Sequence, residues 1–178
     1  MKSNVLLSMI LLIAVAFTAC KKDEIEYRND FETSLKAWQK FKAESGNSYS
    51  YTVYTSSWIG STSETIITIS NGQFVSRVYR TLRPHDHMGP PPKDSPLVEE
   101  WREEGSTLNT KQDGAPLLTL DQIYEQAKND LLLKRPDAKT YFEANNDGLI
   151  SSAGYVEDNC ADDCFRGVNI KSIIRLIP

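Results

Sequence analysis

The dipeptide Asn71-Gly72 constrains the fold of this chain more than any other short segment. It lies between residues 65–70, which are rich in β-branched side chains, and residues 73–81, whose side chains would alternate between the two faces of a second strand. An Asn-Gly pair favours the two-residue type I′ turn, because both central residues of that turn need a positive φ. The segment therefore predicts a β-hairpin, whose strands pair antiparallel.

Helical and extended patterns alternate along the rest of the chain. Apolar spacing predicts a helix that begins near Asn29 or Asp30, has Asn29 as its N-cap and stops at Ser45-Gly46. A second helix is predicted from Thr119, its N-cap, to Pro136, with a buried stripe of Leu120, Ile123, Tyr124, Ala127 and Leu131. Strands are predicted at residues 49–53, 65–70, 73–81, 97–108, 140–144, 149–156 and 168–177.

This order of elements predicts the fold class. The strands cluster between the helices, so no parallel crossovers are implied. We expect an α+β fold, with an antiparallel meander sheet of about six to seven strands and two helices packed on one face. Residues 97–108 are expected to face solvent, and alternate residues of the last strand are expected to share one face: Val168, Ile170, Ser172, Ile174 and Leu176.

The first nineteen residues have the features of a secretory signal. Lys2 is followed by an apolar run over residues 5–17, which is too short for a spanning helix, and small residues then lead to Cys20. The sequence Phe17-Thr18-Ala19-Cys20 resembles the lipobox of bacterial lipoproteins, in which the cysteine receives a diacylglycerol. The resemblance implies lipidation of Cys20 and attachment to a membrane through that lipid.

These features predict the domain organisation and the location. Residues 1–19 are expected to be the signal peptide, residues 20–28 a charged tether, and residues 29–178 a single α+β domain. Lys22-Asp23-Glu24 is similar to the export signal of surface lipoproteins in Bacteroidota-type bacteria, and an ordinary solvated linker explains it equally well. We expect an outer-membrane lipoprotein of the bacterial cell envelope, with periplasmic and surface orientations both open.

Charge composition narrows the partners. The chain has 24 acidic and 20 basic residues and a net charge of −4. This balance disfavours nucleic acid and direct adhesion to anionic lipid as partners. No cofactor is predicted. The expected partners are the membrane, through the lipid anchor, and a protein or a glycan.

The remaining cysteines, Cys160 and Cys164, form an even pair in an oxidising compartment, which predicts a disulfide. A redox-active pair is the alternative, but the C-x-x-x-C spacing and the neighbouring acids disfavour a reactive thiolate. No metal site is predicted. The acids Asp158, Asp162 and Asp163 are candidates for holding Ca²⁺, against the alternative of a solvated loop.

Chemical motifs are sparse elsewhere. His85-Asp86-His87 offers two imidazoles in a proline-rich segment, without a third ligand, so a surface loop is expected. No G-x-S-x-G motif occurs, and no catalytic residue is identified. Trp58 lies among serines and glycine in residues 56–63, so we expect it to be exposed and able to stack on a sugar or anchor a partner protein.

Several structural segments together resemble an uncharacterised family of secreted bacterial lipoprotein domains: Trp38, Tyr49–Val53, Ile69–Gly72 and Leu120–Tyr124. The resemblance implies a helix-plus-antiparallel-sheet module and supplies no catalytic residues. We therefore expect a lipid-anchored, non-enzymatic binding domain. The alternative is a hydrolase acting on envelope glycans or peptides, which a convergent carboxylate pair in a deep cleft would favour.

Overall fold

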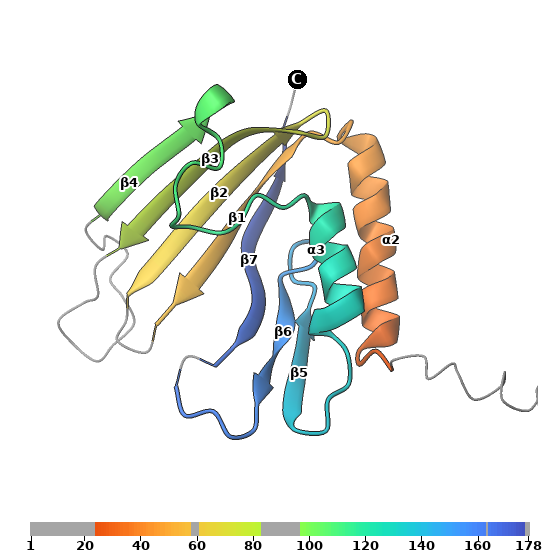
Figure 1. The fold of residues 1–178 in the computed structure, drawn as a ribbon. Coiled ribbons are helices and arrows are strands. Elements are labelled where there is room, and N and C mark those ends of the chain that lie inside the picture. The colour runs from red at the N-terminus through yellow and green to blue at the C-terminus, as the bar shows by residue number, and fades with distance from the viewer. Residues whose placement is uncertain (1–23, 58–60, 83–96, 163, 177–178) are drawn as a thin grey trace, which may run out of the picture.

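The computed structural model describes residues 24–57, 61–82, 97–162 and 164–176 (Figure 1). Cys20, Trp58, His85, His87 and Asp163 lie outside the described residues. The helical elements are α2 (Arg28–Glu44), η1 (Gly105–Thr107), α3 (Leu120–Gln126) and the π-helical turn η2 (Ala127–Leu131). The strands are β1 (Tyr49–Ser56), β2 (Thr62–Ser70), β3 (Gln73–Leu82), β4 (Leu97–Glu104), β5 (Ala138–Glu143), β6 (Ser152–Glu157) and β7 (Arg166–Arg175).

The seven strands form one antiparallel sheet in the order β4-β3-β2-β1-β7-β6-β5. The predicted α+β class and antiparallel sheet are confirmed. The sheet consists of two meanders, β1 to β4 and β5 to β7, which are joined at the centre by the pairing of β1 with β7 (Figure 1). The chain therefore pairs its first strand with its last.

The predicted hairpin turn is confirmed. Asn71 and Gly72 join β2 to β3 with φ values of 50° and 78°. A Cβ atom on Gly72 would lie 2.6 Å from the side-chain nitrogen of Asn47. Position 72 therefore needs glycine for its backbone conformation and for the space beside Asn47.

The second helix follows its prediction closely at its start. The Thr119 hydroxyl accepts from the Gln122 backbone N–H, and the Gln122 side chain accepts from the Thr119 N–H, so the capping box is present. All five residues of the predicted apolar stripe are buried. The helix ends earlier than predicted, because α3 passes into η2 and the helical conformation stops at Leu131 rather than near Pro136.

The first helix begins differently from its prediction. It starts at Arg28 after Tyr27, which has a φ of 56° and no side-chain cap, so Asn29 is not its N-cap. The reason lies in the preceding residues: the Glu26 N–H donates to the Leu132 carbonyl oxygen at 2.9 Å. This pairing fixes the path by which the chain enters α2.

The same pairing shortens the predicted tether. Ile25 forms a β-bridge with Leu133, and the Lys134 N–H donates to the Glu24 carbonyl oxygen at 2.8 Å. The chain is thus part of the folded domain from Glu24 onward. Neither described helix combines the length and apolar character that crossing a bilayer requires.

The core is centred on Trp38 of α2, which is 1% exposed. Its ring lies edge-on to Tyr49 of β1, with centroids 5.1 Å apart, and its Nε1 donates to the Asp121 carboxylate of α3 at 2.9 Å. The Tyr49 hydroxyl accepts from the Leu120 N–H at 3.0 Å, and burial raises the pKa of Tyr49 to about 12. One aromatic cluster therefore ties both helices to the central strand.

Two predictions about strand faces are wrong. Residues 97–108 do not simply face solvent, because Glu103 is 1% exposed and bound by Arg77. In β7, Ile170 is 2% exposed and Ile174 is 58% exposed, so alternate residues do not share one face. The cause in β7 is a β-bulge: Thr52 pairs with Ser172, but Val53 pairs with Ile170, which leaves Lys171 as the extra residue.

Candidate functional site

The two meanders separate where β1 and β7 stop pairing. The paired residues are Tyr49–Val53 of β1 and 170–175 of β7. Beyond the bulge, residues 54–56 continue to pair with β2, and residues 166–169 pair with β6. Figure 1 shows the C-terminal end of β1 diverging from the N-terminal end of β7. Each wall of the resulting opening is a strand held in place by its outer neighbour.

Two adjoining cavities occupy this opening, and we call them together the β1–β7 cleft. The first has a volume of about 460 Å³ and is lined by Tyr54, Ser56, Gly167 and Asn169 among others. The second has a volume of about 630 Å³. Both lie within the range of small-ligand sites. They share three lining residues: Tyr54, Thr62 and Asn169.

The β7 wall depends on a pair of facing glycines. Gly154 of β6 lies opposite Gly167 of β7, and the Phe165 ring covers both. A Cβ atom on Gly154 would lie 2.6 Å from the Phe165 ring, and one on Gly167 would collide with the carbonyl oxygen of Ala153. The Phe165 ring also meets Tyr141 edge-on, at 6.5 Å between centroids. Only glycine at both positions lets Phe165 lie flat on the sheet beside the cleft.

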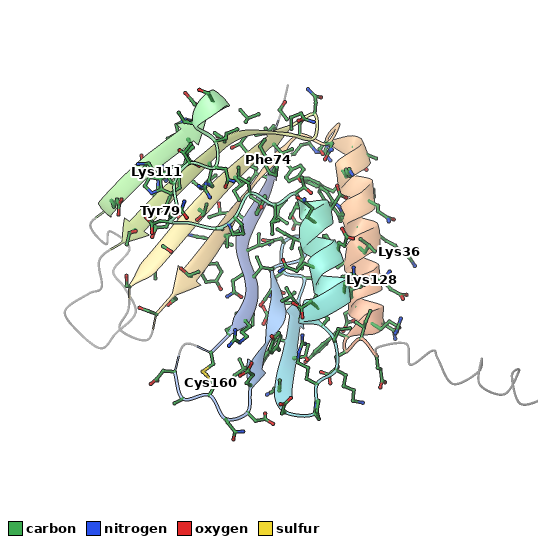
Figure 2. All side chains as sticks on the ribbon, in the orientation of Figure 1. Lys36, Phe74, Tyr79, Lys111, Lys128 and Cys160 are labelled. Carbon is green, nitrogen blue, oxygen red and sulfur yellow. A yellow bond between two sulfur atoms is a disulfide. The ribbon has the colours of Figure 1, made fainter. Side chains whose placement is uncertain are left out.

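The predicted disulfide closes the loop that leads into this wall. Cys160 and Cys164 are bonded, with their Cα atoms 5.9 Å apart, and Cys164 lines the first cavity. Figure 2 shows this bond in the loop between β6 and β7. Asp158 and Asp162 are exposed on the same loop, and Asp163 lies outside the described residues. Among the residues described, no three His, Cys, Asp or Glu side chains converge as a metal site would require.

Polar side chains line the second cavity. Glu64 forms an ion pair with Lys171, and the Glu143 carboxylate accepts from the Asn145 side-chain amide at 2.9 Å. The Ser152 hydroxyl donates to the side-chain oxygen of Asn169 at 2.8 Å. Each of these carboxylates and amides has more hydrogen-bonding capacity than its one partner uses. The Tyr54 ring, 39% exposed, adds an apolar surface at the junction of the two cavities.

A second polar cluster lies over β3 and β4. The Arg77 guanidinium donates to Glu103 at 2.8 Å and also to the carbonyl oxygens of Lys111 and Ala115. The Glu103 carboxylate accepts further bonds from the backbone N–H groups of Asn109 and Thr110. Figure 2 labels Lys111 in the segment that crosses this part of the sheet.

The environment of Glu103 decides its role. Burial alone would raise its pKa, but the hydrogen bonds from Arg77, Lys111, Thr110 and Asn109 outweigh that effect and lower the pKa from 4.5 to about 2. The carboxylate therefore stays ionised at neutral pH, and its oxygens are fully engaged by the chain. This arrangement fixes residues 108–115 onto the sheet and leaves Glu103 unable to act as a proton donor.

The sequence predicts only part of the cleft. Cys164 belongs to the wall, whereas Trp58, in the connection between β1 and β2, lies outside the described residues. The lining residues Tyr54, Asn169 and Gly167 were not identified from the sequence. The signal that was available is the pair Gly154 and Gly167, each within a predicted strand or next to one, since glycine inside a strand indicates a close approach.

Comparison with protein-family models, with curated proteins and with solved structures found no match to this chain.

Proposed function

We propose that this chain is a lipid-anchored cell-envelope protein whose folded domain binds a partner in the β1–β7 cleft without catalysing a reaction. The single observation that carries the proposal is the separation of two neighbouring strands in the middle of an otherwise continuous sheet. The resulting cavities offer amides, hydroxyls and carboxylates that can form hydrogen bonds with a partner, and an exposed tyrosine ring that can pack against it.

The arrangement of the helices supports this location. We infer that both helices cover one face of the sheet, because Trp38 of α2 and Leu120 of α3 meet the same residue, Tyr49. Residues 109–115 also form hydrogen bonds with side chains of β2, β3 and β4. Among the residues described, β1 and β7 stop pairing with each other at the cleft.

The test compares two exposed tyrosines. Tyr54→Ala removes the ring at the junction of the two cavities and should abolish partner binding, while the free energy of unfolding changes by about 1 kcal/mol or less. Tyr27→Asn is the matched control: Tyr27 is 42% exposed, lies at the start of α2 and has a positive φ that asparagine tolerates. The readout is chemical cross-linking of the full-length protein in intact cells, followed by identification of the linked molecule.

An unchanged cross-link in Tyr54→Ala would contradict the proposed site. Loss of the cross-link in both variants would show a general effect of losing a surface ring rather than binding in the cleft. Thermal melts of both variants check that the folded domain persists.

The membrane anchor is tested separately. Cys20→Ser should prevent lipidation, so the protein should become soluble or remain as the unprocessed precursor. The basis is the resemblance of residues 17–20 to a lipobox. Partition of this variant into detergent with the mass of the mature wild type would overturn the lipid anchor and leave the cleft proposal standing.

One observation favours the alternative of a hydrolase: the carboxylates of Glu64 and Glu143 both line the second cavity. Glycoside hydrolysis needs two carboxyl groups on either side of the scissile bond. If the protein is not an enzyme, the wild type should release no soluble fragments from purified cell-wall glycan. Release of such fragments by the wild type, lost in Glu64→Gln or Glu143→Gln, would establish the hydrolase instead.

A further inference from the structure

We propose that the β1–β7 cleft binds an extended peptide segment, which inserts as an additional strand between β1 and β7. The inference deepens the proposed function by naming the class of partner, and it rests on that function. It rests on the direction of the backbone N–H and C=O groups at four residues, which follows from hydrogen bonds on either side of the cleft.

The direction of the β1 backbone groups follows from one hydrogen bond. The Leu176 N–H donates to the Ser48 carbonyl oxygen at 3.2 Å, so the backbone groups of Ser48 point toward β7. In an antiparallel strand, residues two apart point to the same side. The register between β1 and β2 has no shift over Tyr49–Ser56. The N–H and C=O groups of Tyr54 and Ser56 therefore also point toward β7, into the cleft.

The direction of the β7 backbone groups follows in the same way. The Ile170 N–H donates to the Ser151 carbonyl oxygen at 2.7 Å, so the backbone groups of Ile170 point toward β6. The register of β6 with β7 is continuous over residues 166–169. Because backbone groups alternate along a strand, the N–H and C=O groups of Val168 point toward β6, and those of Gly167 and Asn169 point into the cleft.

All four inward-facing residues, Tyr54, Ser56, Gly167 and Asn169, line the first cavity. Among the residues described, no backbone hydrogen bond joins residues 54–56 of β1 to residues 166–169 of β7. The two walls therefore present unpaired N–H and C=O groups toward each other at a two-residue spacing. An extended peptide carries the same groups on both of its edges at that spacing, which is the basis of recognition by strand addition.

The side chains around these positions allow a backbone to approach. Small residues dominate the first cavity, and its lining contains no charged side chain: Thr55, Ser56, Ser57, Ser61, Ser63, Thr81 and Gly167 are examples. Residues 54–56 of β1 and 166–169 of β7 contain neither the lysine nor the proline with which exposed sheet edges are commonly protected, and Lys171, at the bulge, is paired with Glu64 in the second cavity. A glycan would use the scattered hydroxyls, but it has no repeating donor and acceptor pattern to match both walls.

The orientation of the inserted strand follows from the topology. Because β1 and β7 run antiparallel, a strand between them is antiparallel to one wall and parallel to the other. The part of the segment that enters the first cavity should be neutral with small or β-branched side chains, because the lining of that cavity is small and contains no charged side chain.

The experiment uses the full-length protein in detergent and a fluorescein-labelled heptapeptide of alternating threonine and valine. Fluorescence anisotropy should show saturable binding. Ser56→Pro removes one N–H of the β1 wall, and Asn169→Pro removes one of the β7 wall. Each should weaken binding about tenfold, the upper end of what one hydrogen bond contributes.

A proline elsewhere provides the control. The Glu104 N–H donates to the Thr107 hydroxyl and not to β3, so the Arg102 N–H, two residues earlier, also points out of the sheet edge. Arg102→Pro should change the affinity less than about twofold. A peptide with N-methyl groups on two alternate residues should bind about tenfold more weakly to the unchanged protein, which tests the claim even if a proline variant unfolds.

Absence of saturable peptide binding up to about 1 mM, or equal affinity for the methylated peptide, would overturn strand insertion. Chitohexaose serves as the glycan probe. If it binds the wild type and not Tyr54→Ala, while the peptide does not bind, the cleft is a glycan site, so the proposed function stands and this inference fails. If neither probe binds and the cross-link is insensitive to Tyr54→Ala, both fail.

Discussion

Two regions of the sheet contain buried or half-buried polar groups, and they differ in whether the chain supplies the hydrogen-bond partners of those groups. Over β3 and β4 the chain supplies every partner itself: Arg77 and Glu103 bind each other and the backbone of residues 109–115. Between β1 and β7 the chain brings two strand edges together and then leaves them apart. In the first region the chain itself supplies the hydrogen-bond partners, and in the second we propose that another molecule supplies them.

The comparison separates stability from recognition. A buried charge whose hydrogen bonds are complete holds the fold, and its removal is costly. Unpaired backbone groups at a solvated opening contribute little to stability, and they keep their hydrogen-bonding capacity for a partner. Substitutions in the two regions should therefore have opposite consequences.

The largest effect is expected from Glu103→Ala. It leaves the Arg77 guanidinium buried without its counter-ion, which typically costs about 3–5 kcal/mol of unfolding free energy. Glu100→Ala is the control, because Glu100 pairs with Arg80 at the surface and should contribute about 1 kcal/mol or less. Urea unfolding measures both. Equal losses in the two variants would show that the buried pair has no special role.

Acid should weaken the same region. The folded-state pKa of Glu103, about 2, lies below its ordinary value of 4.5. Its contribution is therefore fully present above about pH 4.5 and is lost as the pH falls toward 2. The difference in unfolding free energy between wild type and Glu103→Gln should shrink across that window. A difference that stays constant from pH 6 to pH 2 would contradict the assigned pKa.

A smaller loss is expected from Gly167→Ala, which tests the wall of the cleft. The new Cβ atom would collide with the Ala153 carbonyl oxygen and the Phe165 ring, so we expect a loss of about 1–3 kcal/mol. Gly46→Asn is the control, because a Cβ atom there meets nothing within 4 Å and asparagine tolerates the positive φ. Differential scanning calorimetry compares the two, and an unchanged melting temperature in Gly167→Ala would disprove the close approach.

Opening the disulfide should have a modest effect on stability and a clear effect on binding. The double variant Cys160→Ser, Cys164→Ser should lose about 2 kcal/mol, because the loop that the bond closes is short. Binding in the cleft should also weaken, since Cys164 and Phe165 form part of its wall. The same double change with unaltered affinity would show that this loop does not shape the site.

The sequence predicted local structure well where one signal dominates. The turn at Asn71-Gly72 and the cap at Thr119 are specified by residues within a few positions of each other, and both are confirmed. The N-terminus of α2 was misplaced because its boundary depends on the pairing of Glu26 with Leu132, more than a hundred residues away. Local patterns do not report such contacts.

The site was largely beyond prediction for the same physical reason. Whether the backbone of Ser56 or Asn169 is free depends on which strands pair and on the bulge at Lys171. The segment around that bulge is apolar at alternate positions, so its sequence predicts an unbroken strand. The sequence predicts that residues 97–108 face solvent, and nothing local marks Glu103 as an exception, because its partner Arg77 lies on another strand.

Amide hydrogen exchange of the unliganded protein tests the central claim most directly. The N–H groups of Tyr54 and Asn169 should exchange at least about tenfold faster than those of Val53 and Ile170, which belong to paired positions of the same strands. Adding the threonine-valine peptide should slow exchange at the two fast positions alone. Equal protection of all four amides before any peptide is added would mean that the walls are already paired, and the cleft would not be a binding site for a strand.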